Sequence, residues 1–233
     1  MPDTATLFCI PFAGGNAYSY RLLEQRMHQA IKVLPLELPG RGQRSHENPV
    51  TSMQEMASNL LAIMRPALVQ PYALFGHSMG ALVAYLISCQ LAKELLPLPS
   101  HLFISGKGPP QRSSREPYWH ALPLKEFKQK LAELGGSPAA VLDDEELMDY
   151  FAPFIRDDMQ AMAAYQHNPA PPLTIPITVL IGTADRTTTA PASEWNEMTT
   201  AGFCVVQYEG GHFFLFDHLG DICELVRSRL VGT

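Results

Sequence analysis

Short apolar runs alternate with longer helical patterns along the first half of the chain. Residues 7–10, 31–36 and 72–75 are apolar runs of strand length, whereas residues 17–27 and 81–95 read as helices. This alternation is typical of a parallel sheet covered by helices. Further along, the chain adds three strand-like runs at residues 102–105, 177–181 and 203–208, and a closing amphipathic helix at residues 222–230. The pattern predicts an α/β fold with six or seven strands.

A capping signal marks the start of one further helix. Ser52 is followed three residues later by Glu55, which is the spacing of a capping box. Apolar residues then repeat at helical spacing from Met53 to Met64. We expect this helix to end near Val69, before Pro71.

The alternation stops between residues 106 and 176. Two helical stretches, residues 124–134 and 144–165, are separated there by Gly135-Gly136-Ser137-Pro138. The first part of this segment is basic and the second part is acidic. We expect a helical insertion over the sheet, a lid spanning approximately residues 109–172, within one domain that occupies residues 1–233.

Composition and charge exclude several classes of protein. A chain of 233 residues that is 46% hydrophobic can bury a full core. The formal net charge of −6 gives no general attraction for nucleic acid or for an anionic membrane. No apolar run approaches the roughly 18 residues of a membrane span, and the N-terminus lacks the basic region of a signal peptide. Four cysteines without a Cys-x-x-Cys pattern favour reduced thiols. We expect a cytoplasmic monomer that binds neither nucleic acid nor membrane.

A glycine-flanked serine lies between an apolar strand and a helix. The sequence Gly76-His77-Ser78-Met79-Gly80 follows residues 72–75 and precedes residues 81–95. A serine hydroxyl is a weak nucleophile, so it needs an adjacent base and an exposed position. The Gly-x-Ser-x-Gly turn supplies that exposure in the α/β-hydrolase fold. The motif predicts Ser78 as the nucleophile of such a fold.

An acid and a histidine follow the serine in the order that this fold uses. Asp185 comes after the strand at 177–181, and His212 comes after the strand at 203–208, in a glycine-rich loop. Asp185 would fix the imidazole while the other ring nitrogen faces Ser78. Asp185 is alternatively an ordinary turn residue, and His212 a structural histidine. Asp217 and Asp221 compete for the acid role but follow the histidine, which is the wrong order.

Two backbone N–H groups are expected to stabilise an oxyanion. Met79 directly follows the nucleophile, and the loop after the first strand supplies the second donor. Ala13 is our choice in that loop, with Phe12 as its neighbour. The Gly14-Gly15 pair could instead cradle a phosphate, but no Gly-Lys-Ser/Thr follows it. Histidines and cysteines show no metal-ligand spacing.

Six motifs are spread in order over nearly the whole chain. They are Pro11-Phe12-Ala13-Gly14-Gly15, Leu38-Pro39-Gly40-Arg41-Gly42-Gln43-Arg44, Phe75-Gly76-His77-Ser78-Met79-Gly80-Ala81, Gly182-Thr183-Ala184-Asp185, Trp195 and Gly210-Gly211-His212-Phe213-Phe214-Leu215. Together they resemble the stand-alone type II thioesterases of nonribosomal peptide and polyketide assembly lines. One departure is Arg186-Thr187-Thr188-Thr189, where we expect a proline or a valine nearby; it leaves the shape of this loop open.

The resemblance implies hydrolysis of acyl groups from the phosphopantetheine arm of acyl or peptidyl carrier proteins, which clears stalled or mis-primed intermediates. Ser78, Asp185 and His212 match the catalytic triad of the family, and Met79 and Ala13 match its oxyanion donors. No metal or organic cofactor is implied, because the phosphopantetheine belongs to the substrate.

Basic residues suggest where a carrier protein docks. We expect Arg41, Arg44, Lys107, Lys125 and Lys128 to contact an acidic carrier protein and its phosphopantetheine. The alternative is that these cations form only a solvated helix face.

Two other functions remain open on the sequence. The serine turn alone would equally support a general carboxylesterase or lipase on the same fold. A non-catalytic module that docks on an assembly line is the second alternative, and the complete triad argues against it. The sequence leaves the acyl-chain preference open.

Overall fold

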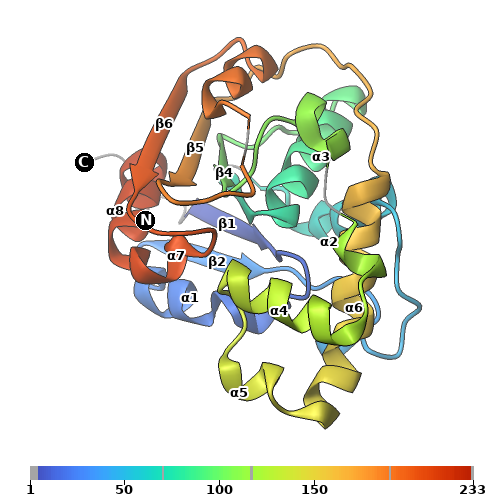
Figure 1. The fold of residues 1–233 in the computed structure, drawn as a ribbon. Coiled ribbons are helices and arrows are strands. Elements are labelled where there is room, and N and C mark those ends of the chain that lie inside the picture. The colour runs from blue at the N-terminus through green and yellow to red at the C-terminus, as the bar shows by residue number, and fades with distance from the viewer. Residues whose placement is uncertain (1–4, 70, 116–117, 189, 232–233) are drawn as a thin grey trace.

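A six-stranded parallel sheet forms the centre of the molecule (Figure 1). The computed structural model describes residues 5–69, 71–115, 118–188 and 190–231. The strand order is β2-β1-β3-β4-β5-β6, and all neighbours pair in parallel. The strands are β1 (Ala5–Ile10), β2 (Ile31–Pro35), β3 (Tyr72–His77), β4 (His101–Ser105), β5 (Ile177–Gly182) and β6 (Phe203–Tyr208). The predicted α/β class and all six predicted runs are confirmed.

Helices cover both faces of the sheet, so that its central strands read as continuous apolar runs. The faces are separated by the alternation of side chains along each strand. In β1, Phe8 and Ile10 pack toward α2 and α3, whereas Leu7 and Cys9 pack toward α1 and α8. The helices that cover the two faces are α1 (Arg21–Met27), α2 (Met53–Met64), α3 (Met79–Lys93) and α8 (Leu219–Leu230). The short helix α7 (Phe214–Asp217) directly precedes α8.

Several helix ends differ from their predicted positions. The helix after Ser52 ends at Met64 and not near Val69, and a 3₁₀ turn at Arg65–Ala67 follows it. Pro66 lacks the N–H that would continue the α-helical hydrogen bonds, which explains the early end. The helix predicted at 17–27 starts with a 3₁₀ turn, Ala17–Tyr20, whose cap is Asn16. These differences affect only the ends of helices, and the order of strands in the sheet does not depend on them.

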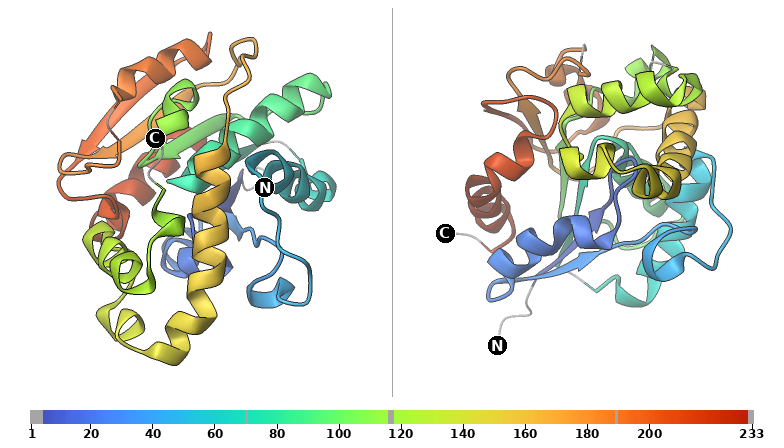
Figure 2. Two further views of the ribbon diagram at one scale, coloured as in Figure 1. Left: turned by 45° about the vertical axis from the view of Figure 1, so that its right-hand side comes forward. Right: turned by 60° about the horizontal axis from the view of Figure 1, so that its bottom comes forward.

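Helices between β4 and β5 lie over the carboxyl ends of the strands (Figures 1 and 2). The predicted stretches appear as α4 (Leu124–Leu134) and α6 (Glu145–Ala164), and the short helix α5 (Ala139–Leu142) was not predicted. We call α4, α5 and α6 the lid helices. Asp144 caps α6 by accepting a hydrogen bond from the N–H of Leu147 at 3.0 Å. Two 3₁₀ turns, Pro110–Arg115 and Trp119–Ala121, precede α4.

A further 3₁₀ segment, Ala192–Met198, lies between β5 and β6. It carries Trp195, which is fully buried and donates a hydrogen bond from Nε1 to the carbonyl of Lys107 at 2.9 Å. The segment thereby fixes the chain that leaves β4. Within the part of the chain described here, no helix has both the length and the apolar character needed to cross a bilayer.

Glycines at the serine turn permit three backbones to touch. A Cβ on Gly76 would overlap the carbonyl of Gly80, and a Cβ on Gly80 would overlap the carbonyl of Ile10. We therefore predict that Gly76→Ala lowers the free energy of unfolding by about 3 kcal/mol or more. Urea unfolding followed by circular dichroism measures the change.

The matched control for this substitution is Gly202→Ala. A Cβ there would meet its nearest neighbour, Pro176 Cβ, at an ordinary 3.7 Å. Equal unfolding midpoints for the two variants would contradict the close packing at the turn.

Candidate active site

Ser78 occupies a strained backbone position at the end of β3. Its φ is +53° and its ψ is −118°, and it is the residue that precedes the first turn of α3. A non-glycine residue with this φ persists only where the surroundings hold it. The Ser78 N–H donates to the carbonyl of Ser105 at 2.8 Å, which ties the turn to β4. The turn thus presents the hydroxyl to the cavity above the sheet.

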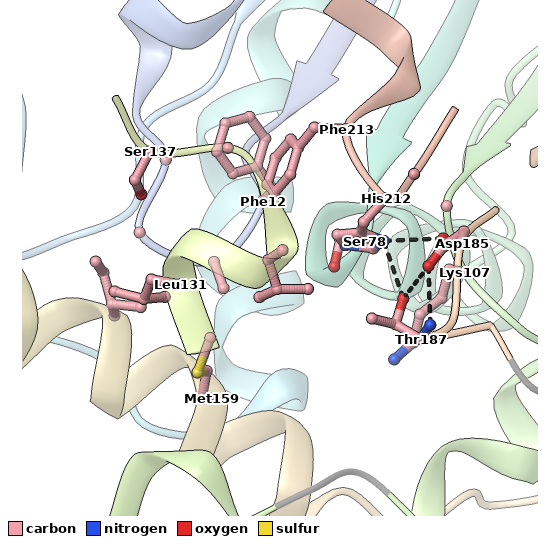
Figure 3. Close-up of a pocket in the computed structure, with 18 of the residues that line it drawn as sticks. Phe12, Ser78, Lys107, Leu131, Ser137, Met159, Asp185, Thr187, His212 and Phe213 are labelled. Carbon is pink, nitrogen blue, oxygen red and sulfur yellow. Dashed lines mark hydrogen bonds and ion pairs between the residues drawn. The ribbon is translucent and has the colours of Figure 1, made fainter. Parts of the chain in front are cut away.

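Asp185 and His212 come together across the ends of two neighbouring strands. His212 Nδ1 lies 2.9 Å from Asp185 Oδ2, and the two side chains are only 7% and 1% exposed. Close packing of the loops after β5 and β6 permits this approach: the Ala184 N–H donates to the carbonyl of Gly210 at 2.8 Å. Figure 3 shows Ser78 beside the His212 ring. With Nδ1 directed at Asp185, Nε2 is the ring nitrogen left for Ser78.

The carboxyl of Asp185 is held in its ionised form. Burial alone raises its pKa, but the hydrogen bond and charge of His212 and the hydrogen bonds of Thr187 lower the pKa to about 2. Asp185 is therefore a carboxylate throughout the neutral range. A carboxylate at this position fixes the protonated Nδ1 tautomer and stabilises the imidazolium that forms during proton transfer.

Two threonines that the sequence analysis did not assign a role surround the acid. Thr187 donates to Asp185 Oδ1 from its N–H at 2.9 Å and from its hydroxyl at 2.7 Å. The same hydroxyl lies 2.9 Å from His212 Nδ1, and Thr188 Oγ1 donates to Asp185 Oδ2 at 3.2 Å. An Asp side chain commonly accepts a hydrogen bond from the backbone N–H two residues on, so Asp185 in a loop offered a clue to the Thr187 N–H contact but not to its hydroxyl. Within the unexpected Arg186-Thr187-Thr188-Thr189 stretch, Thr187 and Thr188 thus hold the acid; Thr189 lies outside the described residues.

His77 is a neutral neighbour of the acid–base pair. It is completely buried, its Nδ1 lies 2.9 Å from Ser105 Oγ, and its ring centroid lies 4.9 Å from that of His212. Burial lowers the pKa of His77 well below its usual range, and His212 lowers it further. Because His77 carries no charge, it does not repel a proton arriving on His212.

Of the two predicted oxyanion donors, Ala13 lines the same cavity, and Met79 directly follows Ser78, which also lines it. Met79 is the first residue of α3, so its N–H precedes the hydrogen bonds within the helix. Ala13 lies in the loop of residues 11–15, which we call the oxyanion loop, in a turn closed by a 2.8 Å hydrogen bond from Gly15 N–H to the Phe12 carbonyl. Ala13 and Ser78 both line the cavity. The donor roles of Met79 and Ala13 stay predictions.

A cavity of about 950 Å³ leads from Ser78 and His212 to the lid helices. Its far wall is apolar and comes mainly from α4 and α6. Figure 3 shows Leu131 and Met159 on this wall, across from the acid–base pair. Other members of the wall are Val141, Met148, Phe151 and Ile155. A concave, mostly apolar site with a few polar groups at one end is typical of a binding site for an organic substrate.

The structure corrects the expected docking role of two arginines. Arg41 is 4% exposed, and both of its terminal nitrogens donate to the carboxylate of Asp158, at 2.6 and 2.7 Å. Arg44 donates to Glu47 at 2.6 Å and, through Nη1, to the Glu37 carbonyl at 2.8 Å. Both guanidinium groups hold the chain after β2 in place, so neither is free to meet a carrier protein.

The three lysines of the predicted docking set occupy different surroundings. Lys107 is buried and lines the cavity. Lys125 is exposed and Lys128 is half-buried on α4. Of the three predicted docking lysines, only Lys125 and Lys128 therefore lie where a protein surface could reach them. Among the residues that the structure describes, no three His, Cys, Asp or Glu side chains gather as metal ligands would.

The parallel sheet, the serine turn and the acid–base pair define an α/β-hydrolase fold. The model of the thioesterase domain family matches residues 5–230, and the chain belongs to this family. It is 35% identical over 225 residues to gramicidin S biosynthesis protein GrsT of Aneurinibacillus migulanus, covering 96% of this chain and 88% of that protein.

Solved structures give the same assignment. The RedJ thioesterase from the prodiginine pathway of Streptomyces coelicolor is 32% identical, with a TM-score of 0.92 over 98% of this chain and 91% of that one. The type II thioesterase BorB from the borrelidin cluster is 33% identical, with a TM-score of 0.90 over 99% of this chain and 94% of that one.

Removal of one hydroxyl tests the support of Asp185. Thr187→Val loses the 2.7 Å hydrogen bond to Asp185 but keeps the backbone N–H bond. We predict a fall in kcat of about 3- to 30-fold with little change in KM. A hydrogen bond to a charged group is worth about 1.5–3 kcal/mol, and the remaining bond from the Thr187 N–H to Asp185 reduces the loss. Steady-state thioester hydrolysis measures it. Thr187→Ser, which restores the hydroxyl, is the control; a kcat in the valine variant equal to that of the serine variant contradicts the role.

Proposed function

We propose that this chain is a serine thioesterase that hydrolyses acyl groups from phosphopantetheine thioesters on the carrier proteins of a nonribosomal peptide or polyketide assembly line. Its role is the removal of stalled or aberrant intermediates. The observation that carries the proposal is the Asp185–His212 pair beside Ser78, at the end of an apolar cavity in a thioesterase-family chain. The names of relatives support it, since GrsT belongs to gramicidin S biosynthesis and BorB is a type II thioesterase.

The reaction proceeds in two halves. His212 Nε2 accepts the proton of the Ser78 hydroxyl as the oxygen attacks the thioester carbonyl, and the N–H groups of Met79 and Ala13 stabilise the oxyanion. The carbon–sulfur bond breaks, and the departing pantetheine thiol receives the proton from His212. A water molecule then gives its proton to the same nitrogen, attacks the acyl-serine and releases the carboxylic acid with regeneration of Ser78. The reaction needs no metal and no organic cofactor of the enzyme.

The two ends of the cavity suit the two ends of such a substrate. The apolar wall of the lid helices suits an acyl chain, whose transfer from water is favourable. Lys107 lines the same cavity as Ser78, and we expect it to contact the pantetheine arm. We further propose that the enzyme acts in the cytoplasm as a monomer, with acyl or peptidyl carrier proteins as its partners and without nucleic acid or membrane.

Rates on three substrates test the proposed function. We expect kcat/KM to be higher for an acyl carrier protein than for the matching acyl-CoA, and higher for both than for an aryl ester of the same acyl group. A strong preference for the aryl ester would instead favour the general carboxylesterase.

Covalent labelling tests whether the site is catalytic at all. A fluorophosphonate probe should label the native protein and Ser58→Ala, an exposed serine of α2, but not Ser78→Ala. Equal labelling of all three proteins, or no labelling and no hydrolysis by the native protein, would favour the non-catalytic docking module.

Charge reversal on α4 tests carrier docking. Lys125→Glu with Lys128→Glu should raise KM for an acyl carrier protein about 5- to 50-fold at low salt, because the new glutamates repel the acidic carrier protein. KM for a small thioester should stay unchanged. Steady-state kinetics with both substrates measures it. The control is Lys93→Glu, an exposed lysine at the opposite end of α3 from Ser78. If both substrates respond equally, docking does not occur on α4.

A further inference from the structure

A buried ion pair joins the lid to the oxyanion loop. Asp158 on α6 is completely buried, and its two carboxylate oxygens accept hydrogen bonds from Arg41 at 2.6 and 2.7 Å. Oδ2 also accepts a hydrogen bond from the N–H of Gly14 at 2.8 Å, and Arg41 Nη1 donates to the carbonyl of Gly15 at 3.3 Å. One carboxylate therefore connects three segments: the loop after β1, the loop after β2 and a lid helix. Figure 1 shows α6 beside the ends of β1 and β2.

The proposed reaction does not use either charge directly. Burial raises the pKa of the Asp158 carboxyl, while Arg41 and the Gly14 N–H oppose that rise by stabilising the carboxylate. An apolar pair of similar volume often stabilises a fold as well as a buried ion pair does. Stability alone therefore does not explain why a buried ion pair occurs here. The hydrogen bonds that the pair makes to Gly14 and Gly15 of the oxyanion loop suggest a role in the active site instead.

The bond from Gly14 fixes the peptide next to the predicted oxyanion donor. The peptide unit between Ala13 and Gly14 is planar, so holding its N–H holds the plane that begins at the Ala13 Cα. Gly14 has a φ of +74°, and a Cβ there would lie 2.5 Å from Ile155 Cγ1 of α6. On the other side, the Gly15 N–H closes the turn onto the Phe12 carbonyl. The oxyanion loop is thus held between β1 and α6.

We propose that Asp158 and Arg41 are positioning residues of the oxyanion hole. The Asp158 carboxylate, oriented by Arg41, holds the Ala13–Gly14 peptide so that the Ala13 N–H points at the site of the oxyanion. The helix α6 is then part of the catalytic apparatus, and the hole is complete only while α6 is seated on the loop. This inference rests on the proposed hydrolysis at Ser78.

Replacing both charges together tests the proposal. In Arg41→Met with Asp158→Leu no unpaired charge is left buried, so the fold should persist with a melting temperature near that of the native protein. The Gly14 N–H loses its acceptor. We expect kcat on an acyl carrier protein to fall about 10- to 100-fold, because loss or misplacement of an oxyanion donor has effects of this size. KM should change by less than about threefold.

A pair of inhibitors separates positioning from general damage. A trifluoromethyl ketone analogue of the acyl-pantetheine forms an oxyanion adduct with Ser78, whereas the corresponding thioether binds without one. In the double variant the affinity for the ketone should fall by the same factor as kcat/KM, and the affinity for the thioether should stay constant. Equal changes for both inhibitors would overturn the proposal. If the double variant does not fold, Arg41→Leu with Asp158→Met, which also leaves no buried charge and no acceptor for Gly14, gives the same test: an unchanged ratio of the two affinities overturns the proposal.

Arg156→Met is the matched control on the same helix. Arg156 lies with its guanidinium carbon 4.2 Å from the centroid of Phe127 and donates to the carbonyl of His120, so its loss loosens the lid without touching Gly14. We expect kcat to stay within about threefold of the native value. An equal loss of kcat in this variant, or native kcat in the double variant, would show that the ion pair only anchors the lid. Either result leaves the proposed function intact, whereas a native protein inactive on every thioester would remove that function first.

Discussion

Contact between backbones at the serine turn is the constraint on which the rest of the structure depends. Gly76 and Gly80 leave no room for a side chain, so β1, β3 and the start of α3 approach one another directly. This approach holds Ser78 at a φ of +53° at the carboxyl edge of the sheet. It also places the oxyanion loop, which leaves β1, beside the nucleophile. One packing requirement thus fixes both the Ser78 hydroxyl and the loop that carries the predicted oxyanion donor, Ala13.

The acid–base pair depends on a second close approach at the same edge of the sheet. β5 and β6 are parallel neighbours, and Gly182 at the end of β5 leaves room for the backbone of Gly210 and Gly211 after β6. Asp185 remains ionised because hydrogen bonds from His212 and Thr187 outweigh the cost of its burial. His77 remains neutral because burial without a strong charged partner disfavours its cation. Asp185 thus keeps its negative charge and His77 stays uncharged. The proposed proton transfer at this edge of the sheet therefore falls to His212.

The lid links substrate binding to the catalytic edge. Its helices supply the apolar wall of the cavity, and α6 contributes Asp158 to the network that reaches Gly14. The arginine of the Leu-Pro-Gly-Arg motif completes this network from the loop after β2. A motif that reads as a basic surface patch is therefore an internal connection, and its glycines serve the turns that bring Arg41 inward.

The sequence by itself determined the α/β class, six strands, the two long lid helices and the order of serine, acid and histidine, because apolar periodicity and glycine-flanked turns are local signals. Only the tertiary structure decided which charges are buried. Arg41 meets Asp158 across 117 positions of the chain, and no local pattern specifies such a pair. The same holds for Thr187, whose hydroxyl serves both Asp185 and His212 only once β5 and β6 lie side by side. Helix ends and the short helix α5 also escaped prediction, since proline and packing outweigh weak local preferences there.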